Sequence, residues 1–519
     1  MTELQFPDAD PTPDEVAVEA QPYQGRFGAI RSLRQHAARG MIVNSIYQIG
    51  LAGLALVRGL GAAAFLTTSE YGIWGLLGLS IFTVIAMKSI GVNQKYVQQS
   101  EDDQELAFQR GFTIELIFSS ISLPTVAAVV CGVALVTGHS ELIVPGLILT
   151  LLVPGLALQF PLMAYYRRMD FRRQRTLQAV DPVVATVVTI LLAALDFGYW
   201  ALVVGAVTGA LVGGIVAIFN SPYPLRVRYD HGTLRRYISF SGPMAVAGVA
   251  VLFSFYAIFL TGNVAIGLVG LGAFTMVGNL VRFTDKADAV IMETLYPAIC
   301  AVQDRVATLY DAFTKSNRLA LMWAAPFGIG VSLFASDLVH FVIGDQWTEA
   351  IPLLEVIGVI TAVHHVGFNW SAFYLARGET KPIAVAAVLG GAATVAAGVP
   401  LMFAAGISGL AWGYAFGEIV ALANRGRYIT RLFPDFKPLR HLMRAFWPTA
   451  IAAGAVLVVD AVAEPGDTAA AAALELGMFL AIVAVATWSF ERALLREAFG
   501  YFSRRSDTSG PEEASAPAV

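Results

Sequence analysis

Apolar stretches separated by short polar connections run along most of the chain. A helix needs about 20 apolar residues to cross a bilayer, because each residue advances it by about 1.5 Å. Short turns such as LDFG at 195–198 and GISG at 406–409 indicate antiparallel helical hairpins. The pattern predicts about fourteen transmembrane helices, at 40–62, 72–94, 109–136, 142–164, 176–195, 199–219, 238–261, 267–290, 319–341, 350–374, 382–403, 408–429, 446–463 and 469–489.

The basic residues separate cleanly from the acidic connections in this arrangement. The opposite connections carry acids such as Glu70, Glu141 and Asp345, with no Lys or Arg. Because cytoplasmic loops are enriched in Lys and Arg, the separation predicts that both termini are cytoplasmic and also supports the number of segments. The basic groups, all on one side, span 26–39, 95–110, 167–175, 226–236, 305–318, 377–381, 425–444 and 492–505.

Aromatic residues gather near the predicted outer ends. Trp and Tyr are enriched at membrane–water interfaces, where one side of the ring is wet and the other apolar. We therefore expect an aromatic belt with no ligand-binding role, formed by Trp74, Tyr199, Trp200, Trp347 and Trp412.

A weak internal repeat divides the chain. YGIWGLLGLSIFTV at 71–84 resembles IGLVGLGAFTMV at 266–277, and LDFGYWALVVG resembles GISGLAWGYAFG before the twelfth segment. Transporters are often built from such repeats. The prediction is an all-α polytopic membrane protein, in which two six-helix bundles are related by pseudo-twofold symmetry and followed by two further helices. The expected boundaries are a disordered cytoplasmic tail at 1–35, bundles at 36–220 and 238–431 with a cytoplasmic linker at 221–237, the added helices at 432–490 and a cytoplasmic tail at 491–519.

Composition points to the same class. Of the 519 residues, 56% are hydrophobic and 14% charged, and the mean hydropathy is +0.65, whereas a soluble domain carries about 25% charged residues. The acidic, proline-containing start lacks the basic region and apolar core of a cleavable signal peptide. Two cysteines, Cys131 and Cys300, exclude a disulfide framework and a Cys-rich metal site.

Apart from the basic groups at the cytoplasmic ends, four basic residues lie inside the predicted segments: Arg58, Lys88, Arg282 and Lys286. A charge facing lipid costs several kcal/mol, so each side chain either snorkels to the interface or faces protein or a water-filled cavity. Arg282 and Lys286 lie within about 40° of each other around a helix. If the two halves repeat, Lys88 and Arg282 occupy corresponding positions. These cations are therefore candidates for binding an anionic head group.

Acids inside the segments are candidates for proton or sodium coupling, namely Glu115, Asp285 and Glu418. Asp285 follows Arg282 by three residues, so a structural ion pair is an equally good interpretation. His364 and His365 are separated by about 100° around a helix and do not make a metal site by themselves. For them we favour packing or interhelical hydrogen bonding.

Enzyme motifs are missing from the sequence. It contains no Walker loop, no HExxH and no GxSxG with partners. The outer connections are too short to form the catalytic loop of a polysaccharide polymerase or ligase. We therefore expect a transporter with no catalytic residue, metal or cofactor.

A series of short strings, in order along nearly the whole chain, resembles the polysaccharide (oligosaccharide-lipid) flippases. These belong to the superfamily shared with multidrug and toxin extrusion antiporters and lipid II flippases. The strings are Arg58-Gly59-Leu60, EYGIW at 70–74, MDFRRQ at 169–174, FGYWALVVG at 197–205, YPAICAVQD at 296–304, GDQW at 344–347 and ARGETK at 376–381.

The resemblance implies two bundles around a central cavity, alternating access and a location in the bacterial cytoplasmic membrane. It implies a substrate of sugar repeat units on a polyprenyl diphosphate, with the four cations serving the diphosphate. Lipid-linked oligosaccharide and membrane lipids are the expected partners, a polysaccharide polymerase is a further candidate, and nucleic acid is not expected. The neutral stretch FYAIFLTGN at 255–263 lacks the charged residue that many relatives carry there. An ion-coupled multidrug antiporter or a lipid II-type flippase remains the alternative.

Overall fold

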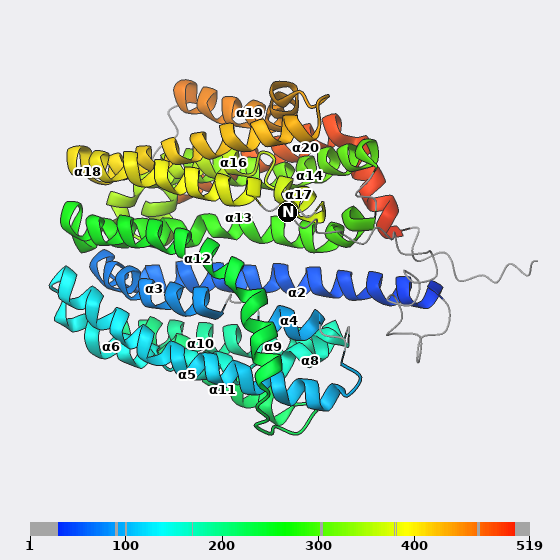
Figure 1. Ribbon diagram of the computed structural model, residues 1–519. Coiled ribbons are helices and arrows are strands. Elements are labelled where there is room, and N and C mark those ends of the chain that lie inside the picture. Colours follow the sequence, from blue (N-terminus) through cyan, green and yellow to red (C-terminus); the bar gives the residue numbers. More distant parts are fainter. Residues whose placement is uncertain are drawn as a thin grey trace, which may run out of the picture.

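A computed structural model describes residues 30–88, 92–98, 101–168, 170–301, 305–377, 379, 381–463 and 468–503. Within these ranges the side chains of some helical residues, including Lys88 and Lys286, are not described. The described chain is helical and contains no strand. Figure 1 shows its long helices running roughly parallel or antiparallel.

The first half of the described chain, up to Phe219, contains ten α-helices and one short 3-10 turn. Several are short consecutive pieces of one predicted segment, as in the case of the turn and the three helices between Ser140 and Arg167. They are α2 (Ile30–Phe65), α3 (Thr68–Lys88), α4 (Val92–Gln98), α5 (Gln104–Thr137), η1 (Ser140–Leu142), α6 (Ile143–Leu149), α7 (Leu152–Ala157), α8 (Leu162–Arg167), α9 (Phe171–Gln178), α10 (Val180–Ala194) and α11 (Trp200–Phe219).

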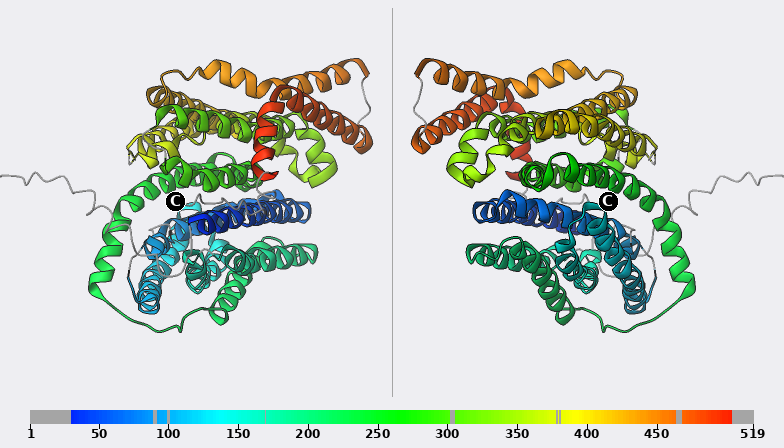
Figure 2. Two further views of the ribbon diagram at one scale, coloured as in Figure 1. Left: turned by 90° about the vertical axis from the view of Figure 1, so that its right-hand side faces the viewer. Right: turned by 90° about the vertical axis from the view of Figure 1, so that its left-hand side faces the viewer.

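The second half begins with a long helix that leaves the first group and joins the second (Figure 2). The helices that follow α13 in the chain pack on one another and form the second group. The elements are α12 (His231–Ala265), α13 (Gly267–Ala301), α14 (Val306–Leu333), α15 (Ala335–Asp337), η2 (Leu338–Ile343), η3 (Asp345–Ala350), α16 (Ile351–His364), α17 (Trp370–Ala376), α18 (Lys381–Leu432), α19 (Pro438–Ala463) and α20 (Ala469–Ser503).

Each of the fourteen predicted segments coincides with helical structure. By length and composition, ten helices among the described residues are suited to crossing a membrane, or eleven if a pair bent by 71° counts as one span. Part of the difference from fourteen is α18, whose 52 residues are interrupted by non-helical backbone at Ala405 and Gly406. The number fourteen therefore stays a prediction.

Glycines allow the predicted hairpins to close tightly. In α18 a side chain at Gly413 would collide with Gly398, and one at Gly409 with the Leu401 carbonyl, so the two arms run antiparallel on either side of Gly406. In the α10–α11 hairpin, Gly205 faces Thr189 and Gly209 faces Ala185. Both hairpins turn where GISG and LDFG predicted a break.

Several element boundaries differ from the predicted domain limits. Helix α2 begins at Ile30, before the predicted end of the tail at residue 35, and α20 continues to Ser503. Within the predicted linker, α12 begins at His231, because the Asp230 carboxylate caps it by accepting a hydrogen bond from the Thr233 amide at 2.7 Å. The hydrogen bonds from Thr233 lower the pKa of Asp230, so the carboxylate is charged near neutral pH. Helices therefore extend past the apolar stretches that cross the membrane.

The two helix groups meet where α13 of the second half contacts α2 and α3 of the first, and these helices lie side by side in Figure 1. The crossing of α3 and α13 is locally symmetric. A side chain at Gly72 would overlap the carbonyl of Leu268, and one at Gly272 would overlap the carbonyl of Thr68. Each residue thus has its counterpart 200 positions along the chain, which agrees with the repeat. Twofold symmetry of the whole bundles stays a prediction.

The halves are sealed against each other at the acidic end, the predicted outer end where Glu70 and Asp345 lie. One apolar cluster there joins Ala63, Leu66 and Tyr71 of the first half to residues of α13, η2, η3 and α16. Trp347 is fully buried in it, donates Nε1–H to the Ala63 carbonyl at 2.8 Å and packs edge-on against Tyr71. The expectation of an interfacial belt is wrong for Trp347, because its indole is fully buried between the halves.

The added helices are tied to α14 by an ion triad whose central acid is buried. Glu491 of α20, only 4% exposed, contacts Arg318 of α14 and lies 3.4 Å from Arg444 of α19. Removing a buried acid leaves its partner charge uncompensated, which costs about 3–5 kcal/mol. We expect Glu491→Ala to lower the thermal unfolding midpoint in detergent by several degrees. Glu349→Ala, at an exposed position, is the control and should leave the midpoint unchanged. Equal midpoints for the two variants would contradict a stabilising triad.

Candidate functional site between the two halves

Arg58 lies on α2, half-buried at the boundary between the halves. Its charge attracts that of Asp181 on α10, and Gln159 Nε2 donates to Asp181 Oδ2 at 2.9 Å. Next to it, the Tyr71 hydroxyl donates to the Gly59 carbonyl at 2.7 Å. Arg58 therefore has protein around it and an acid nearby, which favours the inward-facing interpretation over snorkelling.

Arg282 lies on α13 against an aromatic pair from other helices. Its guanidinium carbon is 5.0 Å from the ring centre of Phe82 on α3 and 5.9 Å from that of Phe255 on α12. The two rings are stacked, with centres 4.4 Å apart. An arginine over aromatic rings is attracted by their quadrupole while its N–H groups stay available to an anion. Asp285 and Tyr414 also interact with Arg282 electrostatically.

The two arginines lie on helices that pack against each other, α2 and α13. A side chain at Gly59, next to Arg58, would touch Asn279 Cβ at 3.8 Å, and Asn279 precedes Arg282 by less than one helical turn. The fold thus brings the parts of α2 and α13 that carry Arg58 and Arg282 together from sequence positions far apart. The side chains of Lys88 and Lys286 lie outside the described residues, so the predicted pairing of Lys88 with Arg282 stays a prediction.

Glu418 of α18 belongs to a polar group inside the second half. His364 Nδ1 is 3.0 Å from Glu418 Oε1, and Arg425 Nη2 is 3.1 Å from the same oxygen. Arg425 also donates to the carbonyls of His364 and Val366. The favoured interpretation of His364, a polar contact between helices, is confirmed. Glu418 is held between two basic groups, which weakens it as a lone site for sodium.

His365 connects this group to the interface. Its ring is fully buried, its Nδ1 lies 2.7 Å from the Thr361 carbonyl, and its Nε2 lies 3.7 Å from Asp285 Oδ1. Asn317 of α14 donates Nδ2–H to the His365 carbonyl at 2.8 Å. Asp285 is therefore positioned between Arg282, on its own helix, and His365, the residue that follows α16.

Glu115, the third predicted coupling acid, is buried on α5 in the first half and does not belong to this group. The sequence analysis missed Asp181 and Arg425. Asp181 lies five residues inside the segment predicted at 176–195 and could have been found there as an intramembrane acid. Arg425 was counted with a cytoplasmic basic group, and its burial follows from helix packing alone.

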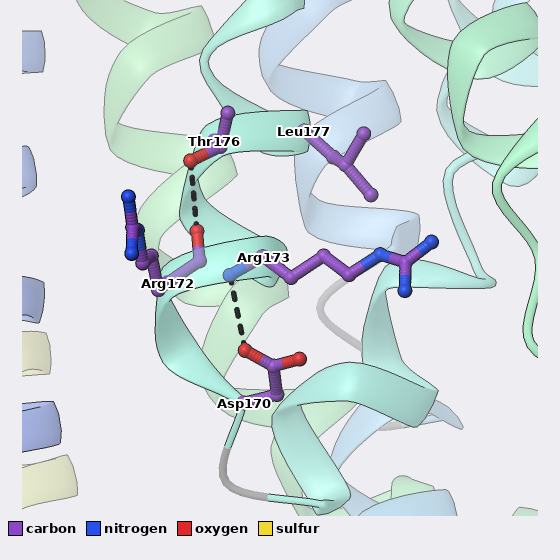
Figure 3. Close-up of a pocket in the computed structure, with 5 residues that line it drawn as sticks. All are labelled: Asp170, Arg172, Arg173, Thr176 and Leu177. Atoms are coloured by element: carbon purple, nitrogen blue, oxygen red, sulfur yellow. Dashed lines mark hydrogen bonds between the residues drawn. The ribbon is translucent and has the colours of Figure 1, made fainter.

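A hollow of about 340 Å³ lies on α9, lined by Asp170, Arg172 and Arg173 of the MDFRRQ string and by Thr176 and Leu177, which follow it. Figure 3 shows the side chains of Arg172 and Arg173 pointing away from one another, while Asp170 caps the helix at the Arg173 amide. The Arg173 guanidinium lies over the Tyr165 ring. The string thus begins helix α9 in a basic region. The two arginine side chains do not point to a common site.

Structural comparison shows the fold. A structure titled lipid II flippase MurJ, inward closed conformation, superposes with a TM-score of 0.63 at 12% identity, covering 88% of this chain and all of that one. An inward-facing multidrug resistance MATE family transporter of the MOP superfamily gives a TM-score of 0.60 at 13% identity, covering 76% of this chain and all of that one. The chain therefore has the multi-pass membrane fold of these transporters.

The sequence relatives are distant, and the names of two of them refer to the biosynthesis of succinoglycan or lipopolysaccharide. Succinoglycan biosynthesis transport protein ExoT of Rhizobium meliloti (strain 1021) is 22% identical over 291 residues, which cover 53% of this chain and 57% of ExoT. Lipopolysaccharide biosynthesis protein WzxC of Escherichia coli (strain K12) is 20% identical over 403 residues, covering 72% of this chain and 78% of WzxC. The model of the family described as polysaccharide biosynthesis protein matches residues 62–352, more than half of the chain. This chain belongs to that polysaccharide biosynthesis protein family.

Proposed function

We propose that this protein is a flippase, which moves oligosaccharide repeat units linked to a polyprenyl diphosphate from the cytoplasmic to the outer leaflet for cell-surface polysaccharide export. The supporting observation is that Arg58 and Arg282 both lie inside predicted membrane segments, on helices α2 and α13, which pack together where the two halves meet. Charge-assisted hydrogen bonds from guanidinium groups suit a diphosphate, and the lipid tail is able to stay in the bilayer.

The sealed acidic end supports a cycle of alternating access. The cluster around Trp347 packs the halves together at that end, so we propose that the cations are reached from the opposite, basic end in this conformation. Opening the cluster while closing the basic end would expose the head group to the other side. Lys88 and Lys286 are proposed as further diphosphate contacts, while Glu115, Asp285 and Glu418 are the proposed candidates for ion coupling.

We also propose a membrane location and an orientation for the protein. We place the protein in the bacterial cytoplasmic membrane with both termini in the cytoplasm, in accord with the basic clusters. The two six-helix bundles with their linker, added helices and tails follow the limits predicted above, apart from the helix extensions. Lipid-linked oligosaccharide is the proposed substrate, a polysaccharide polymerase is a proposed partner, and no catalytic chemistry is involved.

A transport assay in vesicles tests the function. Purified protein is reconstituted with a defined polyprenyl-diphosphate oligosaccharide, and the sugar exposed on the far leaflet is measured with an impermeant lectin. Protein-dependent exposure is the expected result. Export of organic cations driven by an ion gradient, without lipid translocation, would favour the antiporter of similar fold. Translocation of lipid II but not of oligosaccharide lipids would favour the lipid II-type alternative.

A further inference from the structure

The position of His365 determines how its ring carries protons. Its Nδ1 lies 2.7 Å from the Thr361 carbonyl oxygen, which only accepts hydrogen bonds. Nδ1 must therefore carry the hydrogen, and in the neutral ring Nε2 is an acceptor. Because the ring is fully buried, it has little freedom to exchange these roles.

Nε2 faces a second acceptor. Asp285 Oδ1 lies 3.7 Å from it, and the Asp285 side chain is 56% exposed. A carboxylate opposite the lone pair of a neutral imidazole is unfavourable, whereas one added proton turns the contact into a hydrogen bond or an ion pair. The exposed carboxylate gives that proton a route from water.

Asp285 is also the acid nearest in sequence to Arg282, and the two charges attract each other. An unprotonated Asp285 therefore neutralises part of the positive charge that Arg282 offers to an anion. When the proton is bound, the carboxylate charge is cancelled whether the proton resides on oxygen or on Nε2. More of the Arg282 charge is then available to a ligand.

We propose that Asp285 and His365 form a proton-binding pair that links proton uptake to the binding of an anionic head group at Arg282. The inference rests on the proposed function, because it takes the diphosphate as the anion. Its sign is fixed: the protonated pair favours the bound anion, so the affinity rises as the pH falls. By reciprocity, binding of the anion favours proton uptake by the same factor.

Other charged and titratable groups surround the pair. Arg425 is close enough for its positive charge to repel a positive charge on His365. The shared proton is therefore drawn toward Asp285. Glu418 is held by His364 and Arg425 and forms a separate titratable pair. His441 Nε2 reaches Asn317 Oδ1 at 2.8 Å, behind the His365 carbonyl. Among the side chains that the structure describes, the groups facing the pair are Arg282 of α13, His364 of α16, Tyr414, Glu418 and Arg425 of α18 and, through Asn317 of α14, His441 of α19.

The test measures the affinity of full-length protein for a polyprenyl-diphosphate sugar at pH 6 and pH 8. This probe is a diester of diphosphate, so its own charge stays constant over the range. We expect the parent protein to bind about tenfold more tightly at pH 6, within the usual range of coupling between sites. Asp285→Asn should bind at both pH values as tightly as the parent at pH 6, since its side chain is uncharged.

His365→Asn keeps an N–H donor for the Thr361 carbonyl but lacks the ring acceptor. It should bind at both pH values as weakly as the parent at pH 8. His231→Asn, at an exposed position at the start of α12, is the matched control and should keep the tenfold dependence. A parent protein that binds without pH dependence, or a dependence that Asp285→Asn and His365→Asn both keep, would overturn the pair alone. If the parent protein does not bind the probe at pH 6 and does not bind it at pH 8, the proposed function is refuted, and this inference with it.

Discussion

Replacing Gly272 by alanine should prevent the acidic end from closing. The added Cβ would overlap the Thr68 carbonyl and lie 2.9 Å from the Gly72 amide nitrogen, and backbone atoms cannot move aside as a flexible side chain can. Overpacking of this kind costs about 1–3 kcal/mol, which corresponds to a shift of roughly 5- to 150-fold between two conformations. We expect transport to fall at least tenfold (an order-of-magnitude figure from the same shift).

The closure itself is measured by labelling. In a background without Cys131 and Cys300, Leu66→Cys places a thiol in the cluster, where Leu66 is 1% exposed. An impermeant maleimide should leave it unlabelled in the parent and label it when Gly272→Ala is present. Gly278→Ala on the same helix is the matched control, because no atom lies within 4 Å of its added Cβ. Equal labelling with both substitutions would show that the crossing does not hold the end closed.

Because the crossing is locally symmetric, the same prediction applies to a second variant. Gly72→Ala meets the Leu268 carbonyl as Gly272→Ala meets that of Thr68, so the two variants should behave alike. A variant that fails to fold would be recognised by size-exclusion chromatography, and the partner variant would then carry the test. Opposite behaviour of the two would contradict a crossing that works as one unit.

Replacing Arg282 by alanine should weaken binding of the diphosphate by about 10- to 100-fold, because a hydrogen bond to a charged group contributes about 1.5–3 kcal/mol. Arg282→Lys keeps the charge but not the planar pair of donors, so we expect a smaller loss. Affinity for the lipid-linked sugar and its rate of translocation are the measurements.

The matched control for this prediction is Arg492→Ala, which removes an exposed arginine near the end of α20. It should leave affinity and rate unchanged. Unfolding midpoints should accompany the kinetics, since Arg282 also rests on Phe82 and Phe255 and removing it costs some packing. Normal binding and transport by a well-folded Arg282→Ala would contradict the proposed role of the cation.

The sequence by itself determined the helical membrane class, the positions of the helices and the turns of the hairpins. These features depend on local properties: about 20 apolar residues suffice to cross a bilayer, and glycine-containing turns end helices wherever they occur. The same reasoning found Arg58 and Arg282, because an arginine inside an apolar stretch is conspicuous whatever surrounds it.

Only the tertiary structure decided which partners these residues have. Trp347 resembled an interfacial aromatic until packing placed it between the halves, and Arg425 resembled a cytoplasmic cation until its guanidinium was seen to hold the end of α16. Asp285 could equally have paired within its own helix or with a distant histidine. Such contacts join residues tens to hundreds of positions apart, and periodicity along one helix contains no information about which face of another helix it meets.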